Sequence, residues 1–234
     1  MSLSLPPGPS AILFDATRYD KRTQALAILL SGVAGYVDAT GFMATGGFFL
    51  SFMSGNTTRL AVGFAEAAPF IALVASLIAA FVLGAMGGSL VGRLAQQRRR
   101  GAVLLFVAAL LAAAGGLAAM GHDWVAVVLA AGSMGAENAV FEDEGDVRIG
   151  LTYMTGALVK FAQRLLASFF GEARWAWLSH LLLWFGLVMG AVVGAATYPH
   201  LGLQGLWAAS VALVILAGIA YLMGPARPRK ACDV

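Results

Sequence analysis

Charged residues are scarce in this chain. Of its 234 residues, 12% are Asp, Glu, Lys or Arg and 60% are hydrophobic, whereas a soluble domain carries about 25% charged residues. This shortage excludes a soluble globular enzyme, a nucleic-acid-binding module and a disordered regulator. The 15 Lys plus Arg only slightly exceed the 12 Asp plus Glu, and they gather at the ends of apolar segments, where they report topology. The composition predicts an integral membrane protein whose first partner is the lipid bilayer and which binds no nucleic acid.

Cysteine and histidine are also rare. The one cysteine, Cys232, cannot form an intramolecular disulfide or a thiolate metal site by itself. The three histidines, His122, His180 and His200, have no metal-ligand spacing. We therefore expect no metal site, no cofactor and no redox chemistry.

Long apolar runs are what the chain has in abundance. With about 20 residues as the length that spans a bilayer, eight apolar segments can be identified. They cover approximately residues 24–45, 47–65, 68–92, 101–119, 124–141, 147–168, 175–197 and 204–223.

The last four segments resemble a degraded copy of the first four. Matched residues recur at an offset that grows from 100 to 102 positions, and internal repeats are common in transporters. The matched pairs are Gly35 with Gly135, Asp38 with Asn138, Ala39 with Ala139, Met53 with Met154, Ser54 with Thr155, Gly55 with Gly156, Arg59 with Lys160, Gly84 with Gly186, Gly88 with Gly190 and Gly92 with Gly194. An acid matched with an amide, a hydroxyl with a hydroxyl and a cation with a cation, in one order, indicate a duplication.

Basic residues set the expected topology. Clusters lie before the first segment, between the third and fourth segments, and after the last segment, and such clusters stay in the cytoplasm. Their members are Arg18, Lys21 and Arg22; Arg93, Arg98, Arg99 and Arg100; and Arg227, Arg229 and Lys230. Eight full crossings cannot place all three clusters on one side.

Six crossings can do so, if segments 24–45 and 47–65 together cross once and segments 124–141 and 147–168 together cross once. Three crossings per half make the two repeats inverted. One member of each pair must then be a broken or re-entrant helix, and the sequence does not decide which. The prediction is an all-α polytopic membrane protein with two inverted repeats of three crossings each; the alternative is an eight-segment 4+4 parallel repeat.

The expected domain organisation follows from this topology. Residues 1–22 form a cytoplasmic arm without the apolar core of a signal peptide, 23–119 the first membrane repeat, 120–224 the second, and 225–234 a cytoplasmic basic tail. Both termini are expected in the cytoplasm of a bacterial inner membrane protein. The acidic run after the fifth segment is expected to reach water; its members are Glu142, Asp143, Glu144 and Asp146.

The stretch GYVDATGFMATGGFFLSFMSGNTTRLAVG at 35–63, with its weaker echoes GAENA at 135–139 and MTGALVK at 154–160, resembles the YoaK-like family of bacterial integral membrane proteins, a domain-of-unknown-function family. The resemblance extends from about Arg18 to Met223. It implies an inner-membrane protein with about six spans and supplies no substrate or activity.

Polar residues inside the apolar segments are the candidate solute-binding site. Asp38 lies near mid-depth, where an ionisable group is a functional candidate; alternatively it pairs with Arg59 or Lys160, or caps a helix break. The run SGNTTR at 54–59 can expose backbone amides of a half-helix to a solute, or it can serve helix packing only. The predicted solute-binding residues are Asp38, Ser54, Gly55, Asn56, Thr57, Arg59, Glu137, Asn138, Thr155, Gly156 and Lys160. We expect Asp38, Asn56 and Asn138 to surround one central polar cavity between the two helix breaks.

Two glycine ridges are predicted to be packing faces. They consist of Gly84, Gly88 and Gly92, and of Gly186, Gly190 and Gly194. We expect them to pack against each other, or to join two copies of the chain in a homo-oligomer.

The leading functional hypothesis is a small-solute membrane transporter or channel, because inverted repeats with broken central helices are the architecture of alternating access. The alternatives are a non-catalytic membrane assembly or stress protein and, less favoured, a membrane-embedded enzyme. No catalytic residues can be named, because Asp38, Ser54 and His180 do not have the spacing of a recognised catalytic set.

Overall fold

The computed structural model describes residues 20–143, 146–147, 151–171 and 174–223. Most of the expected N-terminal arm, the basic tail with Cys232, and Glu144 of the acidic run lie outside the described residues. The described part is helical apart from two short strands, β1 (Glu142–Asp143) and β2 (Asp146–Val147), which pair antiparallel.

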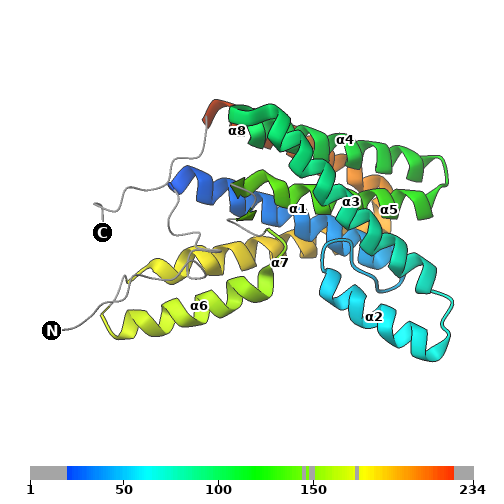
Figure 1. The fold of residues 1–234 in the computed structure, drawn as a ribbon, viewed down its shortest axis with the longest axis horizontal. Coiled ribbons are helices and arrows are strands. Elements are labelled where there is room, and N and C mark those ends of the chain that lie inside the picture. Colours follow the sequence, from blue (N-terminus) through cyan, green and yellow to red (C-terminus); the bar gives the residue numbers. More distant parts are fainter. Residues whose placement is uncertain (1–19, 144–145, 148–150, 172–173, 224–234) are drawn as a thin grey trace.

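In the part of the chain that the structure describes, six helices have about the length that crosses a bilayer. They are α1 (Lys21–Thr45), α3 (Ile71–Ala95), α4 (Arg99–Ala119), α5 (Asp123–Glu137, continued by the 3-10 turn η4, Asn138–Phe141), α7 (Ala176–Leu201) and α8 (Leu206–Met223). By length and composition four apolar stretches could span a membrane: Lys21–Thr45, Ile71–Ala119, Asp123–Phe141 and Ala176–Met223. Two of these stretches reverse direction at the 3-10 turns η3 (Gln96–Arg98) and η5 (Gly202–Gly205), and so supply two helices each (Figure 1).

Two further helices are too short to span. α2 (Met53–Glu66) has 14 residues and α6 (Met154–Phe169) has 16, fewer than the roughly 17 residues of the shortest spanning helices. Their shortness favours the second member of each segment pair as the re-entrant one. Within the described residues six helices have crossing length, which favours the six-crossing prediction over the eight-segment alternative.

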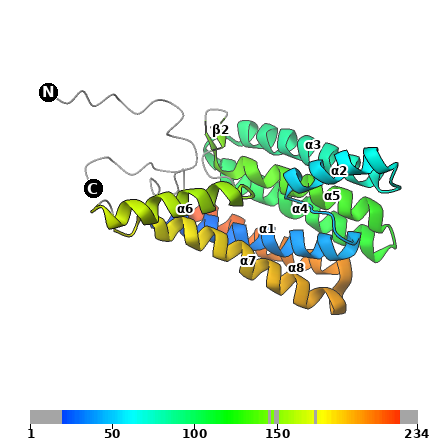
Figure 2. The same cartoon turned by 90° about the horizontal axis from the view of Figure 1, so that it is seen from below.

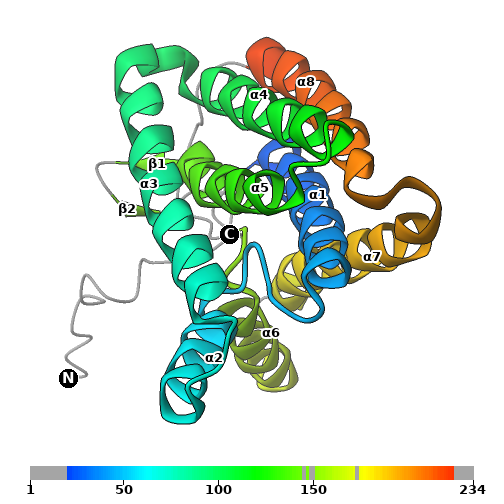
Figure 3. The same cartoon turned by 90° about the vertical axis from the view of Figure 1, so that its right-hand side faces the viewer.

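The helices form three layers (Figure 3). α3, α5, α1 and α7 lie side by side in the middle layer, α4 and α8 cover one face, and α2 and α6 lie against the other face. α5 is the most enclosed of these helices, with every residue from Ala130 to Glu137 buried. Figures 1 and 2 show that α2 and α6 lie toward opposite ends of the bundle.

Glycines allow the middle-layer helices to cross with their backbones in contact. A Cβ atom on Gly84 of α3 would collide with the carbonyl of Gly132 in α5, and one on Gly190 of α7 would collide with the carbonyl of Gly32 in α1. Close approach through small residues is how membrane helices gain packing energy. The ridges therefore pack against α5 and α1, and the prediction that they pack against each other or join two copies is wrong.

The crossings also correct the register of the repeat. Gly88 meets the carbonyl oxygen of Ala136 as Gly194 meets that of Tyr36. The spatial equivalent of Gly88 is therefore Gly194, an offset of 106 positions, and not Gly190 as the sequence match predicts. Both ridges have glycines at every fourth residue. Aligning the two ridges with a shift of one helical turn therefore matches glycine with glycine almost as well, and the sequence alone selects the wrong alignment.

The basic clusters that the structure describes lie at one end of the bundle. Lys21 and Arg22 begin α1, and Arg98 to Arg100 connect α3 to α4. In Figure 1 the start of α1, the connection between α3 and α4 and the end of α8 share that end. This arrangement agrees with six crossings.

Replacing Gly84 or Gly190 by Ala should lower the stability of the bundle, because the new methyl group meets backbone of the partner helix. We expect a loss of about 1–3 kcal/mol for each, as for other overpacked interiors. Gly218 is the matched control, since a Cβ there meets nothing within 4 Å, and Gly218→Ala should leave stability unchanged or raise it slightly. Thermal unfolding in detergent measures all three; unfolding of Gly84→Ala and Gly190→Ala at the wild-type temperature would contradict the crossing geometry.

Candidate functional site

The chain between α1 and α2 turns back into the bundle. Gly46 and Gly47 have φ values of +71° and +120°, which glycine adopts without strain, and they reverse the chain. Leu50 is fully buried and packs against Gly41, where a Cβ would collide with the Leu50 side chain. Segment 46–52 therefore folds back along the second half of α1, and its tip lies beside Gly41 and not beyond the end of that helix.

Asp38 holds the tip of this segment. Its Oδ1 atom accepts hydrogen bonds from the backbone N–H groups of Leu50 at 2.7 Å and Ser51 at 2.8 Å. The side chain of Ser51 and the backbone N–H of Phe52 also lie beside this carboxyl group. These donors directly precede α2, so a carboxylate near the positive end of the helix dipole satisfies them as a helix cap does.

Asn56 fixes the same segment from α2. The side chain is fully buried, its Nδ2 donates to the carbonyl oxygen of Phe49 at 2.6 Å, and its Oδ1 accepts from the N–H of Phe49 at 3.0 Å. Both functions of the amide are used by the backbone. Asn56 therefore braces segment 46–52, with both amide functions bonded to the backbone of Phe49.

The second repeat has a corresponding tether. Asn138, which follows α5, donates from Nδ2 to the carbonyl of Met134 at 3.0 Å, and its Oδ1 accepts from the hydroxyl of Thr152 at 3.1 Å. Thr152 and its neighbour Leu151 are buried directly before α6. Asn138 at the end of α5 thus holds the segment before α6, as Asp38 of α1 holds the segment before α2.

Ser51 and Thr152 are the functional candidates that the sequence analysis missed. The signal was present, because LSFMSG at 50–55 and LTYMTG at 151–156 match at every position by identity or by residue class. The two hydroxyls are 101 positions apart, which is the offset of the neighbouring matched residues.

Asp38 also faces a groove between α1 and α7. The groove has a volume of about 320 Å³ and is mostly apolar. Besides Asp38 it is lined by Gly35, Ala39, Phe42, Met43, Phe49, Leu187, Ala191 and Ala195. Asp38 is therefore positioned both to hold the re-entrant segment and to meet a molecule that enters this groove.

Glu137 is the second acid at membrane depth. It is fully buried in α5, and neither carboxyl oxygen has a hydrogen-bond partner among the described residues. Isolated ionisable groups in a membrane interior are costly and usually serve a function. The burial of Glu137 without a hydrogen-bond partner among the described residues supports the prediction that it is a site residue. It does not line the Asp38 groove.

Several predicted site residues do not converge on Asp38. Ser54, Thr57, Thr155 and Gly156 are exposed. Arg59 is also exposed, with its guanidinium 5.1 Å from the centre of the Phe48 ring.

The expected ion pair of Asp38 with Arg59 or Lys160 is therefore replaced by backbone hydrogen bonds. Neither Asn56 nor Asn138 lines the groove that contains Asp38. For this groove, the prediction that Asp38, Asn56 and Asn138 surround one cavity is therefore wrong.

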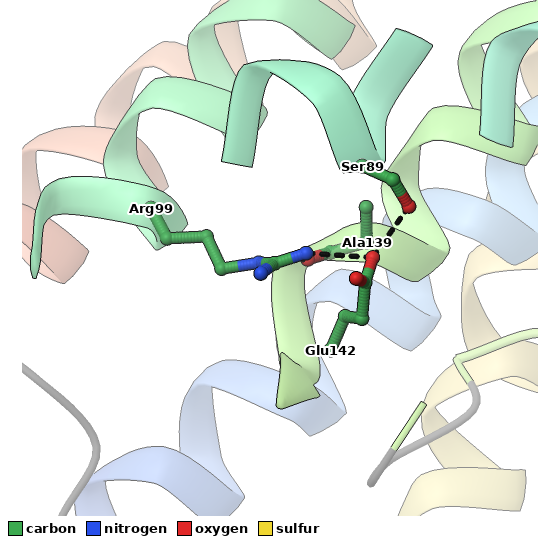
Figure 4. A network of polar contacts seen from close by, with 4 residues as sticks. All are labelled: Ser89, Arg99, Ala139 and Glu142. Atoms are coloured by element: carbon green, nitrogen blue, oxygen red, sulfur yellow. Dashed lines mark hydrogen bonds and ion pairs between the residues drawn. The ribbon is translucent and has the colours of Figure 1, made fainter. Parts of the chain in front are cut away.

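A polar network closes the other end of α5 (Figure 4). Glu142 forms an ion pair with Arg99 at 2.6 Å and accepts a hydrogen bond from the hydroxyl of Ser89, while the Nε of Arg99 donates to the carbonyl of Ala139 at 3.0 Å. The Glu142 side chain is only 6% exposed. The expectation that Glu142 reaches water is wrong, because Arg99 supplies the counter-charge inside the protein.

Replacing Asp38 tests the tether. Asp38→Leu leaves the N–H groups of Leu50 and Ser51 without an acceptor, at about 1–3 kcal/mol for each buried donor, whereas Asp38→Asn keeps an acceptor oxygen. We expect Asp38→Leu to unfold at a clearly lower temperature than Asp38→Asn in detergent. Asp20→Leu is the control, since Asp20 caps α1 at an exposed position and its loss costs only about 1 kcal/mol. Equal stability of the two Asp38 variants would exclude the tether.

The comparisons with known proteins agree with this architecture. A family described as "Protein of unknown function (DUF1275)" matches residues 26–219. A UPF0700 transmembrane protein of Rhizobium meliloti (strain 1021) is 37% identical over 199 residues, which cover 84% of this chain and 85% of that protein. No solved structure matches. The resemblance to the YoaK-like membrane proteins is confirmed, and the chain belongs to the DUF1275 family, described as proteins of unknown function.

Proposed function

We propose that this protein is a transporter or channel for a small solute, and that its two re-entrant segments form the gates of the pathway. The proposal rests on two equivalent tethers, which are side-chain hydrogen bonds that hold the segments before α2 and α6. Asp38 holds the segment before α2, and Asn138 holds the segment before α6. Each segment brings non-helical backbone to membrane depth, which proteins tolerate only where it is buried or lines a wet cavity.

An inverted repeat is part of this proposal. α1, α3 and α4 correspond to α5, α7 and α8, and the partners in each pair run in opposite directions in Figure 1. The crossing of α1 with α7 uses the same glycine pattern as the crossing of α5 with α3. Inverted repeats with discontinuous helices are the common architecture of secondary transporters.

In this proposal Asp38 senses the solute. Its carboxyl group both lines the groove between α1 and α7 and accepts the N–H groups of the segment. A solute with hydrogen-bond donors competes with those N–H groups for the carboxyl oxygens. Binding then weakens the tether and frees the segment that follows Gly46 and Gly47 to move.

The remaining predicted residues have supporting roles. Ser54 and Thr57 in α2, and Thr155 in α6, offer hydroxyl groups along the exposed faces of the two half-helices. Gly55, Gly156, Arg59 and Lys160 lie on the same two half-helices. We place the protein in the bacterial inner membrane with both termini in the cytoplasm, because the basic clusters share one end.

Ser51→Ala and Thr152→Ala test the role of the tethers in transport. Each removes one buried hydroxyl, at about 0.5–1.5 kcal/mol, so the variants should remain folded. Ser210→Ala is the matched control, since its buried hydroxyl bonds the carbonyl of Ala108 in α4, away from both segments. In proteoliposomes, flux of water, urea, glycerol and small ions is followed by light scattering and ion-sensitive dyes.

We expect wild type and Ser210→Ala to carry the same flux, and both tether variants to change it at least severalfold. A wild-type protein that moves none of these probes, or tether variants that behave like Ser210→Ala, would contradict the proposal.

A further inference from the structure

A second cavity lies at the end of the bundle opposite Arg98 to Arg100. It has a volume of about 430 Å³, within the range of roughly 300–1,000 Å³ that ligand sites occupy. Its walls come from the ends of α1, α4 and α7, the beginnings of α3 and α5, and the turn η5. It shares no lining residue with the Asp38 groove.

The walls of this cavity are fixed by hydrogen bonds. The hydroxyl of Tyr36 in α1 donates to the carbonyl of Gly205 at 3.1 Å and so holds η5 against the bundle. On the other side, the N–H of His122 donates to the carbonyl of Leu117 at 2.9 Å, and Gly121 has a φ of +81°. The tight turn between α4 and α5 thus places the start of α5 at the cavity.

The polar and aromatic lining favours a positive charge. Asp123 supplies a carboxylate, Trp124 and Tyr198 supply aromatic rings, and Gln204 and Thr45 supply neutral polar groups. The Trp124 side chain is 52% exposed, so one aromatic surface is open to an incoming molecule. Aromatic faces attract ammonium groups, tryptophan most strongly.

Two acidic residues lie at this end of the bundle, and one cation, Arg59 of α2, lies against Gly47 in segment 46–52. The connections there, 46–52, 67–70, 120–122 and 202–205, hold no Lys or Arg, while Glu66 ends α2 and Asp123 begins α5. Asp123 is the one charged residue among those that line the cavity, and a concave site of one charge sign concentrates ligands of the opposite sign.

We propose that this cavity binds a small organic cation through its ammonium group, with Asp123 as the counter-ion and Trp124 and Tyr198 as aromatic walls. The site does not depend on the proposed transport function. Binding would stand even if no solute crossed the membrane.

The test uses the full chain in detergent and tetramethylammonium as the probe. Tryptophan fluorescence and calorimetry follow the titration, and potassium chloride at equal concentration controls for ionic strength. Asp123→Asn keeps a polar side chain in the first turn of α5 and removes the charge. Glu66→Gln is the matched control, since Glu66 lies at the same end and does not line the cavity.

We expect saturable binding to wild type and to Glu66→Gln, and at least tenfold weaker binding to Asp123→Asn with its thermal stability retained. Trp124→Phe should remove the fluorescence change while calorimetry still detects binding. The proposal is overturned if no saturable binding occurs, if potassium competes equally, or if Asp123→Asn binds as wild type does. In that last outcome Asp123 serves only the dipole of α5.

Discussion

Every backbone N–H group at membrane depth needs an acceptor, and this requirement governs the centre of the molecule. Segment 46–52 cannot bond to itself as a helix does, so its donors depend on groups outside the segment. Asp38 and Asn56 supply those groups from the helices on either side. Without them the segment would expose unsatisfied amides in an apolar interior, at several kcal/mol in hydrocarbon. The acid in the first repeat is therefore required by the fold before any role in function is considered.

The glycine crossings make this arrangement compatible with a rigid surrounding bundle. Because α1 and α7, and likewise α3 and α5, touch backbone to backbone, the middle layer is thin and leaves its helices little freedom to separate. The half-helices α2 and α6 have fewer neighbours; α2 packs chiefly on α3, and α6 chiefly on α7. With fewer neighbours, α2 and α6 can move more easily than the crossing helices can separate. A gated pathway in a fixed scaffold requires this difference.

The sequence predicted much of the fold because charge and hydropathy act through local rules. The basic clusters required six crossings, and Asp38 and Asn138 were found by their place in the repeat. The sequence does not single out Ser51 and Thr152 as tether residues, because the backbone N–H of Ser51 and the hydroxyl of Thr152 lie 13 and 14 residues from their acceptors, a separation that no helical spacing predicts. Arg59 was paired wrongly with Asp38, because nearby backbone donors satisfy that acid without ordering a long side chain.

In the proposed topology the two re-entrant segments enter the membrane from opposite faces. Single cysteines at Ser54 and Thr155, in a background with Cys232→Ser, test it most directly, because both positions are exposed and lie at the starts of α2 and α6. A membrane-impermeant maleimide is applied to intact cells and to inverted membrane vesicles. We expect position 54 to react from the outside and position 155 to react from the cytoplasmic side. Reaction of both positions from one side, or of neither from any side, would contradict it.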